Sequence, residues 1–286
     1  MKPARVLLFT TLAMIAFAGN SLLCRLALKQ TEIDAPSFTF IRIISGAIML
    51  WLIVRARRAA PNNAGSWTSA LALFVYAAAF SFAYISLSAG TGALLLFGAV
   101  QATMILWGLH KGERLHGWQI LGLFMALAGL VALVFPGLSA PPLGGSLLML
   151  GAGFAWGVYS LRGKAAAGDP VNATAGNFLR AVPFAAMLSL AVFPWAHVDR
   201  AGTVYAILSG AIASALGYAI WYTALPALPA AIAAAVQLSV PIIAAAGGII
   251  FLRETLTPRL VLAACAVLGG IVLVVLGKAR LPARDH

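Results

Sequence analysis

Residues 117–135 read GWQILGLFMALAGLVALVF, an unbroken stretch without a charged side chain. A helix needs about 20 apolar residues to cross the hydrocarbon core of a bilayer, because each residue rises by about 1.5 Å. Water is absent from that core, so the backbone must satisfy its hydrogen bonds internally, as a helix does. This stretch therefore predicts a transmembrane helix.

Similar apolar stretches precede and follow it, and turn-forming Pro, Gly and Asn residues separate most of them. The predicted spans are 6–26, 36–54, 67–87, 91–109, 117–135, 143–161, 171–193, 201–222, 230–252 and 260–276. The fold class predicted is all-α integral membrane, with ten transmembrane helices.

The composition agrees with a membrane protein. Of the 286 residues, 62% are hydrophobic and 9% are charged, whereas soluble domains carry about 25% charged residues. The net charge of +12 comes from basic residues that flank the apolar stretches. Such residues set orientation and contact anionic lipids, and no basic aromatic surface of the nucleic-acid-binding kind accompanies them. The expected partners are a lipid bilayer and a small solute, not nucleic acid.

The loops differ in basic charge. With the N-terminus in the cytoplasm, twelve Lys and Arg residues fall inside, and the outer side holds five, namely Arg25, Lys29, Arg200, Arg253 and Arg259. The positive-inside rule therefore predicts that both termini are cytoplasmic.

The two halves of the chain match each other at an offset of 135 to 141 residues. Residues 17–25 align with 154–162, and residues 40–42 align with 178–180. Further matches pair Gln101 with Gln237, Glu113 with Glu254, and Gly129 with Gly270. An odd number of helices per copy inverts the second copy, so we predict two inverted five-helix repeats, 1–137 and 138–286, suited to alternating access.

The Phe38 to Arg42 and Phe178 to Arg180 patterns, Pro241 and the Arg253-Glu254-Thr255-Leu256 run give a family resemblance. The chain resembles the EamA-type branch of the drug/metabolite transporter superfamily, and within it the YddG-type exporters, whose substrates include aromatic amino acids. The resemblance implies a carrier in the bacterial inner membrane that exports small metabolites through a central cavity. Ile105 stands where a counterpart of Pro241 would be, so we expect a short or bent fourth helix.

All seven acidic residues fall at span ends, in loops or in the tail. A carrier of lipophilic cations usually needs a buried acid as counter-charge, so a neutral or zwitterionic substrate such as an amino acid is favoured. The four histidines do not converge with other groups, and neither a catalytic residue, a metal ion nor a cofactor is expected. A multidrug or cation exporter and, less favoured, an intramembrane enzyme remain alternatives. The chain is expected to act as a monomer or a homodimer.

Gln101 and Gln237 are the first candidates for substrate contact, because an uncharged amide near mid-span can donate and accept hydrogen bonds. Pro241 has no amide hydrogen and frees the carbonyl group four residues earlier, which is that of Gln237. Hydrogen bonding between helices is an equally good interpretation of the two glutamines.

Aromatic and small polar residues supply the other candidates. Tyr76, Phe80 and Tyr84 recur every four residues and share one helix face, where they could form a cavity wall or pack ordinarily. The remaining candidates for substrate contact are Asn20, Ser21, Trp156, Tyr159 and Tyr218. Trp221 and Tyr222 are interpreted as part of an interfacial belt.

Arg42 and Arg180 lie inside predicted spans, where a cation is costly unless it is paired or faces water. Because both halves contain the arginine, a structural or gating role is favoured over binding of a substrate carboxylate. Glu113 and Glu254 are interpreted as solvated residues at loop starts.

Overall fold

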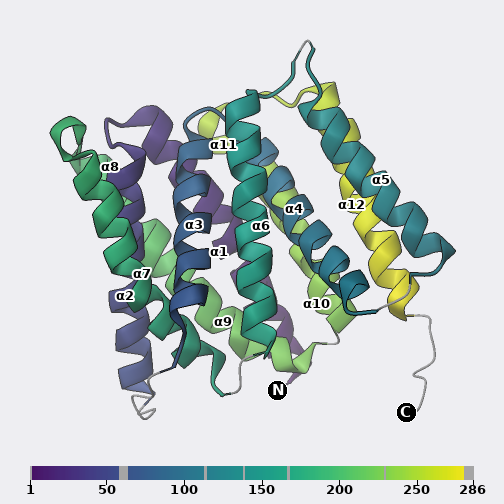
Figure 1. The fold of residues 1–286 in the computed structure, drawn as a ribbon, viewed down its shortest axis with the longest axis horizontal. Helices are drawn as coiled ribbons and strands as arrows, with labels where there is room; N and C mark the ends of the chain where they lie inside the picture. The colour runs from purple at the N-terminus through teal and green to yellow at the C-terminus, as the bar shows by residue number, and fades with distance from the viewer. Residues whose placement is uncertain are drawn as a thin grey trace.

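The computed structural model describes residues 2–57, 64–112, 115–137, 139–165, 168–228 and 230–279, and within these ranges the secondary structure is helical. The long helices stand side by side, and the start of the first helix and the end of the last helix both point toward the lower edge of the view in Figure 1. The prediction of an all-helical membrane fold is confirmed.

The first five spans are single continuous helices: α1 (Pro3–Gln30), α2 (Ala35–Ala56), α3 (Trp67–Tyr84), α4 (Ala89–His110) and α5 (Gly117–Val134). Side chains of Asp34, Ser66 and Ser88 accept hydrogen bonds from backbone N–H groups in the first turns of α2, α3 and α4. These caps satisfy donors that a helix start leaves unpaired. The caps thus fix where these three helices begin.

The second five spans are less regular. The sixth, seventh and tenth spans are the helices α6 (Leu143–Ala165), α7 (Pro170–Ala191) and α12 (Pro258–Ala279). The eighth span is composite and consists of α8 (Arg200–Ile207), the π-helical η2 (Leu208–Leu216), α9 (Gly217–Ala224) and the short η3 (Leu225–Ala227). The ninth span consists of α10 (Ala230–Gln237) and α11 (Ser239–Leu252). A single 3₁₀ turn, η1 (Phe193–Trp195), follows α7.

Nine spans within the described ranges are long and apolar enough to cross a membrane. The tenth, α7, has 22 residues but carries Asn172, Asn177, Arg180 and the internal Pro183. Its length still suffices for a bilayer. Its polar residues instead mark it as a helix that contacts other groups within the protein.

The spans that carry Gln101 and Gln237 differ in continuity. The ninth span is interrupted at Leu238, between Gln237 at the end of α10 and Ser239 at the start of α11. The interruption lies near Pro241, which cannot donate a backbone hydrogen bond. By contrast, α4 is one continuous 22-residue helix, so the expectation of a short fourth helix is wrong. Ile105 keeps its amide hydrogen, and no break is required there.

The main contacts between helices come in pairs, in which a helix of one half of the chain takes the place of its counterpart in the other half. The α2 helix packs on α7 and α4 packs on α11, while α3 contacts α6 as α1 contacts the eighth span. The α5 and α12 helices pack on each other and lie together at one edge of Figure 1. Each of these contacts thus has a counterpart with the two halves of the chain exchanged, and the division into two five-helix repeats stays a prediction.

Glycines permit the close approach of α5 and α12. A Cβ atom on Gly122 would clash with the backbone oxygen of Gly270, and one on Gly270 would meet Gly122 and Ala126. A Cβ on Gly129 would crowd Ala266 at 2.9 Å. The glycines matched between the halves therefore pack helices within one chain.

Candidate functional site

A cavity of about 550 Å³ lies between the central helices. This volume is within the range of about 300–1,000 Å³ typical of small-molecule sites. The cavity reaches the connections between α6 and α7 and between η3 and α10, where Gly168, Pro170 and Leu228 contribute to its wall. Its remaining lining comes from Phe17, Asn20, Ser21, Tyr76, Phe80, Leu96, Phe97, Val100, Gln101, Met104, Trp156, Tyr159, Ser160, Gly163, Ala173, Thr174, Asn177, Ala213, Tyr218, Trp221, Tyr222, Leu225, Ala233, Ala234 and Gln237.

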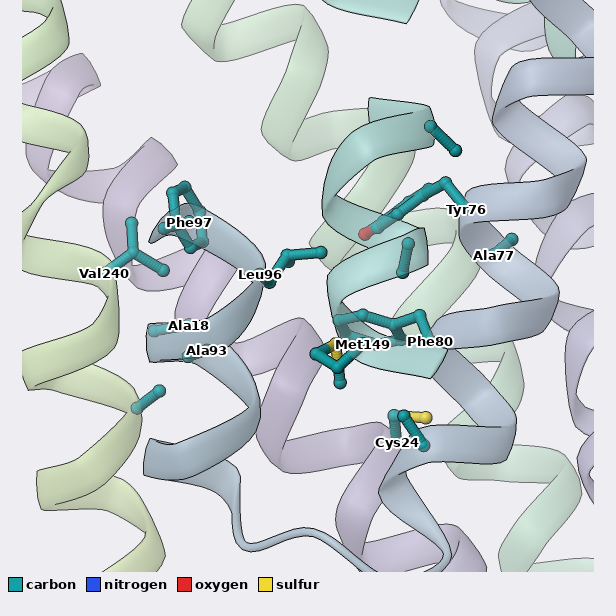
Figure 2. Packing of buried hydrophobic residues seen from close by; sticks show 14 of the residues in the cluster. Ala18, Cys24, Tyr76, Ala77, Phe80, Ala93, Leu96, Phe97, Met149 and Val240 are labelled. Atoms are coloured by element: carbon teal, nitrogen blue, oxygen red, sulfur yellow. The ribbon is translucent and has the colours of Figure 1, made fainter. Parts of the chain in front are cut away.

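An aromatic cluster forms one side of the cavity, with Trp156 of α6 at its centre. The ring centroid of Trp156 lies 4.7 Å from that of Tyr76, 5.1 Å from that of Tyr159 and 5.3 Å from that of Tyr218. Figure 2 shows Tyr76 and Phe80 projecting from α3 toward α6. Such ring faces can hold an apolar or aromatic side chain, and their quadrupoles can attract an ammonium group.

Gln101 and Gln237 both line the cavity, on α4 and at the end of α10. Gln101 is 7% exposed, and Gln237 is half-buried. Among the described residues, neither side-chain amide forms a hydrogen bond to the other or to a neighbour. The glutamines thus present free amide groups to the cavity, whereas the interhelical bonding interpretation would have paired them.

A chain of hydrogen bonds runs behind the aromatic cluster. The Tyr76 hydroxyl accepts from Asn20 Nδ2 at 3.3 Å and from Arg42 Nη2 at 3.1 Å. Asn20 Oδ1 in turn accepts from the Ser209 hydroxyl at 2.6 Å, and Arg42 Nη2 lies 3.5 Å from Ser214 Oγ. These polar groups therefore form one network that contacts the cavity through Asn20 and Tyr76.

The π-helical η2 segment supplies both serines of this network. Its hydrogen bonds run from residue i to residue i+5, so its turns are wider than those of an α-helix. Residues five apart, such as Ser209 and Ser214, consequently stay near one face. That face lies against α2, where Gly210 is so close to the Arg42 carbonyl group that a Cβ would clash.

Four of the predicted residues lie outside the cavity wall. Tyr84 is fully buried, packs edge-on against Phe80, and donates its hydroxyl to the Ala89 carbonyl group, so the structure differs from the prediction of a substrate contact. Arg42 lies one layer behind the wall, and Pro241 is buried within α11. Arg180 donates to the carbonyl oxygens of Ala64 and Gly176 at 2.8 and 3.0 Å, a position that suits the bracing role.

Several cavity residues were not predicted. Trp221 is 6% exposed and lines the cavity together with Tyr222, so their assignment to an interfacial belt is wrong. Asn177 and Thr174 of α7 and Met104 of α4 also line it. The polar residues within α7 were the available signal, because an amide inside a span needs a partner or a polar cavity.

A buried ion pair lies beside Tyr84, outside the cavity wall. Arg25 Nε lies 3.2 Å from Glu254 Oε1, and the two side chains are 8% and 10% exposed. Arg25 also donates to the carbonyl oxygens of Tyr84 and Ile85, while Glu254 Oε2 accepts from the Ala89 amide at 2.8 Å. The interpretation of Glu254 as solvated is therefore wrong, and Glu113 falls outside the described residues.

Comparison with known proteins gives a consistent match. The model of the EamA-like transporter family matches residues 143–276. The chain is 58% identical to an uncharacterized protein of Pseudomonas aeruginosa, with 100% of this chain and 99% of that protein aligned. It is 30% identical to an uncharacterized transporter of Archaeoglobus fulgidus, over 76% of this chain and 79% of that protein.

More distant likenesses cover less sequence or show the fold alone. The threonine/homoserine exporter RhtA of Salmonella typhimurium is 34% identical over 44% of this chain and 43% of that exporter. One crystal structure of a protein superposes with a TM-score of 0.68 at 16% identity, covering 97% of this chain and 99% of that one. At that identity the structure supports the helical architecture.

Proposed function

The chain belongs to the EamA-like transporter family, and we propose that it exports amino acids or similar small zwitterions across the bacterial inner membrane. The observation that carries this proposal is the chemistry of the cavity wall. The lining contains free amides and aromatic rings, and no carboxylate among the described residues contributes to it. A zwitterion can use amide, hydroxyl and aromatic groups for both of its charges.

The second line of support is the asymmetry of the cavity. Its open end lies at the α6–α7 and η3–α10 connections, which the distribution of Lys and Arg assigns to the cytoplasm. The Arg25–Glu254 pair lies beside Tyr84, outside the cavity wall. An exporter must bind its substrate from the cytoplasm, so this arrangement suits the loading state of the transport cycle. Rocking of the two repeats would then expose the same site to the other face.

The likeness to RhtA adds weight to amino acids as substrates, because that relative is a threonine/homoserine exporter. The aromatic cluster around Trp156 extends the proposal to amino acids with aromatic or thioether side chains, for which ring faces are favourable partners. A multidrug exporter of cations fits less well, because a desolvated cation would have no carboxylate counter-charge in the described wall.

Counterflow in proteoliposomes tests the proposal. Purified protein is reconstituted with an internal excess of unlabelled amino acid, and entry of labelled Phe, Trp, Met or Thr is measured against protein-free liposomes. We expect one or more of these amino acids to accumulate transiently without chemical change. Accumulation of tetraphenylphosphonium alone would instead favour a cation exporter. A chemically altered product would favour the enzyme alternative.

A further inference from the structure

Arg42 is a buried cation that has no carboxylate partner among the residues that the structure describes. Its side chain is 2% exposed, and the ion pair found among the described residues joins Arg25 to Glu254 instead. Its Nη1 atom has no hydrogen-bond acceptor in the described part of the protein. Burying an uncompensated charge is costly, and breaking a buried pair is strongly destabilising for the same reason. A buried, unpaired arginine is expected where its electric field acts on a nearby group or where it helps to bind a ligand.

The guanidinium group lies directly behind the cavity wall. Its Cζ atom is 4.9 Å from the Phe80 ring centroid and 5.3 Å from the Tyr76 ring centroid, and both rings line the cavity. The ring faces lower the cost of the charge by cation–π attraction. In a low-dielectric interior the positive potential still extends through one layer of side chains. The cavity near Tyr76 is therefore electropositive.

The Tyr76 hydroxyl links Arg42 to the cavity, because it accepts a hydrogen bond from Arg42 and keeps its own hydrogen for donation. A hydroxyl has two acceptor lone pairs and one hydrogen. Both acceptor positions are taken, because Arg42 can act only as a donor and the Asn20 amide nitrogen donates as well. The phenolic hydrogen is then left to donate to a further acceptor. Since Tyr76 lines the cavity, that acceptor can be a group of the solute.

We propose that Tyr76, backed by Arg42 and oriented by Asn20, binds a carboxylate group of the transported solute. This inference rests on the proposed function, because it takes the cavity as the transport site. It narrows the substrate class to solutes with a carboxylate, anionic or zwitterionic, and excludes amines that lack one. The rings of Trp156 and Tyr218 then receive the rest of the molecule.

The test uses matched probes that differ in the carboxylate. Binding of L-phenylalanine, 3-phenylpropionate, L-phenylalaninamide, L-threonine and L-threoninamide to the purified full-length protein is measured by calorimetry. In the wild-type protein we expect at least one carboxylate probe to bind about tenfold more tightly than its amide, the loss expected when a charge-assisted hydrogen bond is missing. Equal or tighter binding of the amides, or no binding of any carboxylate, would overturn the proposal.

The variant Tyr76→Phe separates recognition from packing. It keeps the ring and removes the hydroxyl, so the tenfold preference for carboxylate over amide should fall to about one. A merely structural role would weaken carboxylate and amide probes alike and leave their ratio unchanged. Tyr205→Phe, on α8 and outside the cavity wall, is the matched control and should retain the wild-type ratio.

Transport data distinguish this inference from the proposed function. If the protein moves amides or amines in counterflow as well as amino acids, transport through the chain stands and the carboxylate site fails. If no amino acid moves although carboxylate probes bind with the expected ratio, the recognition site stands and the proposed export fails.

Discussion

Arg25 and Glu254 are 229 residues apart in the sequence and form an ion pair of 3.2 Å between Nε and Oε1. The pair joins the C-terminal half of α1 to the connection between α11 and α12, and hydrogen bonds extend it to the connection between α3 and α4. Elements from both halves of the chain are thus held together at this ion pair. In an alternating-access cycle this contact must separate before the solute can leave on that side.

Loss of this ion pair should make the cavity more accessible from the outer side of the membrane. In Arg25→Gln the Glu254 carboxylate is left buried without its cation, a change that costs about 3–5 kcal/mol where a buried pair is broken. We expect Ser21→Cys, introduced with Cys24→Ala and Cys265→Ala, to react faster with an impermeant maleimide added from outside when Arg25→Gln is present. Lys29→Gln, an exposed change at the same helix end, is the control. Unchanged reactivity in a folded Arg25→Gln protein would contradict the gating role.

Gln237→Leu should impair transport and leave stability nearly unchanged. The Gln237 amide lines the cavity without a hydrogen-bond partner among the described residues, so its removal leaves no protein group unpaired. The loss of one solute contact corresponds to about a tenfold fall in transport efficiency. Counterflow rate and thermal melting temperature are measured together.

Gln119→Leu, in contrast to Gln237→Leu, is expected to lower stability. Gln119 is 2% exposed, and its side chain bonds the Val274 carbonyl oxygen at 3.3 Å and the His116 amide at 2.9 Å. Its replacement should lower the melting temperature, because the Val274 carbonyl oxygen and the His116 amide lose their partner. A melting loss in Gln237→Leu equal to that in Gln119→Leu would show that Gln237 is structural.

Gly270→Ala should destabilise the pair of α5 and α12. Its added Cβ would meet the Ala126 nitrogen at 2.7 Å and the Gly122 carbonyl oxygen, and overpacking of this kind costs about 1–3 kcal/mol. Gly151→Ala in α6 is the control, because no atom lies within 4 Å of its added Cβ. Chemical unfolding should show a loss for the first variant and none for the second, and equal stabilities would refute close packing at Gly270.

Much of the fold could be predicted because the spans follow from local properties. Apolar length and turn residues located the ten helices, and the halves matched at Gln101 and Gln237, both of which line the cavity. The break at Leu238 near Pro241 also follows from local backbone chemistry. These features need no knowledge of which helices are neighbours.

The residues that were assigned wrongly are those whose surroundings depend on depth within the membrane and on contacts between distant parts of the sequence. Tyr76, Phe80 and Tyr84 share a helix face, but the cavity extends along only part of it, and helical periodicity carries no information about depth. Trp221 was assigned to the interface for the same reason. The burial of Glu254 depends on Arg25, a contact that only the folded arrangement creates.

Movement of the solute through this cavity is tested by cysteine protection. Ala234→Cys places a thiol in the cavity wall of α10, and Arg55→Cys places one on the exposed end of α2; both are made with Cys24→Ala and Cys265→Ala. Maleimide labelling is measured in inside-out vesicles with and without a saturating amino acid that counterflow has shown to be transported. We expect the amino acid to slow labelling at Ala234→Cys and to leave labelling at Arg55→Cys unchanged. Equal labelling rates at Ala234→Cys with and without the transported amino acid would contradict movement of the solute through this cavity.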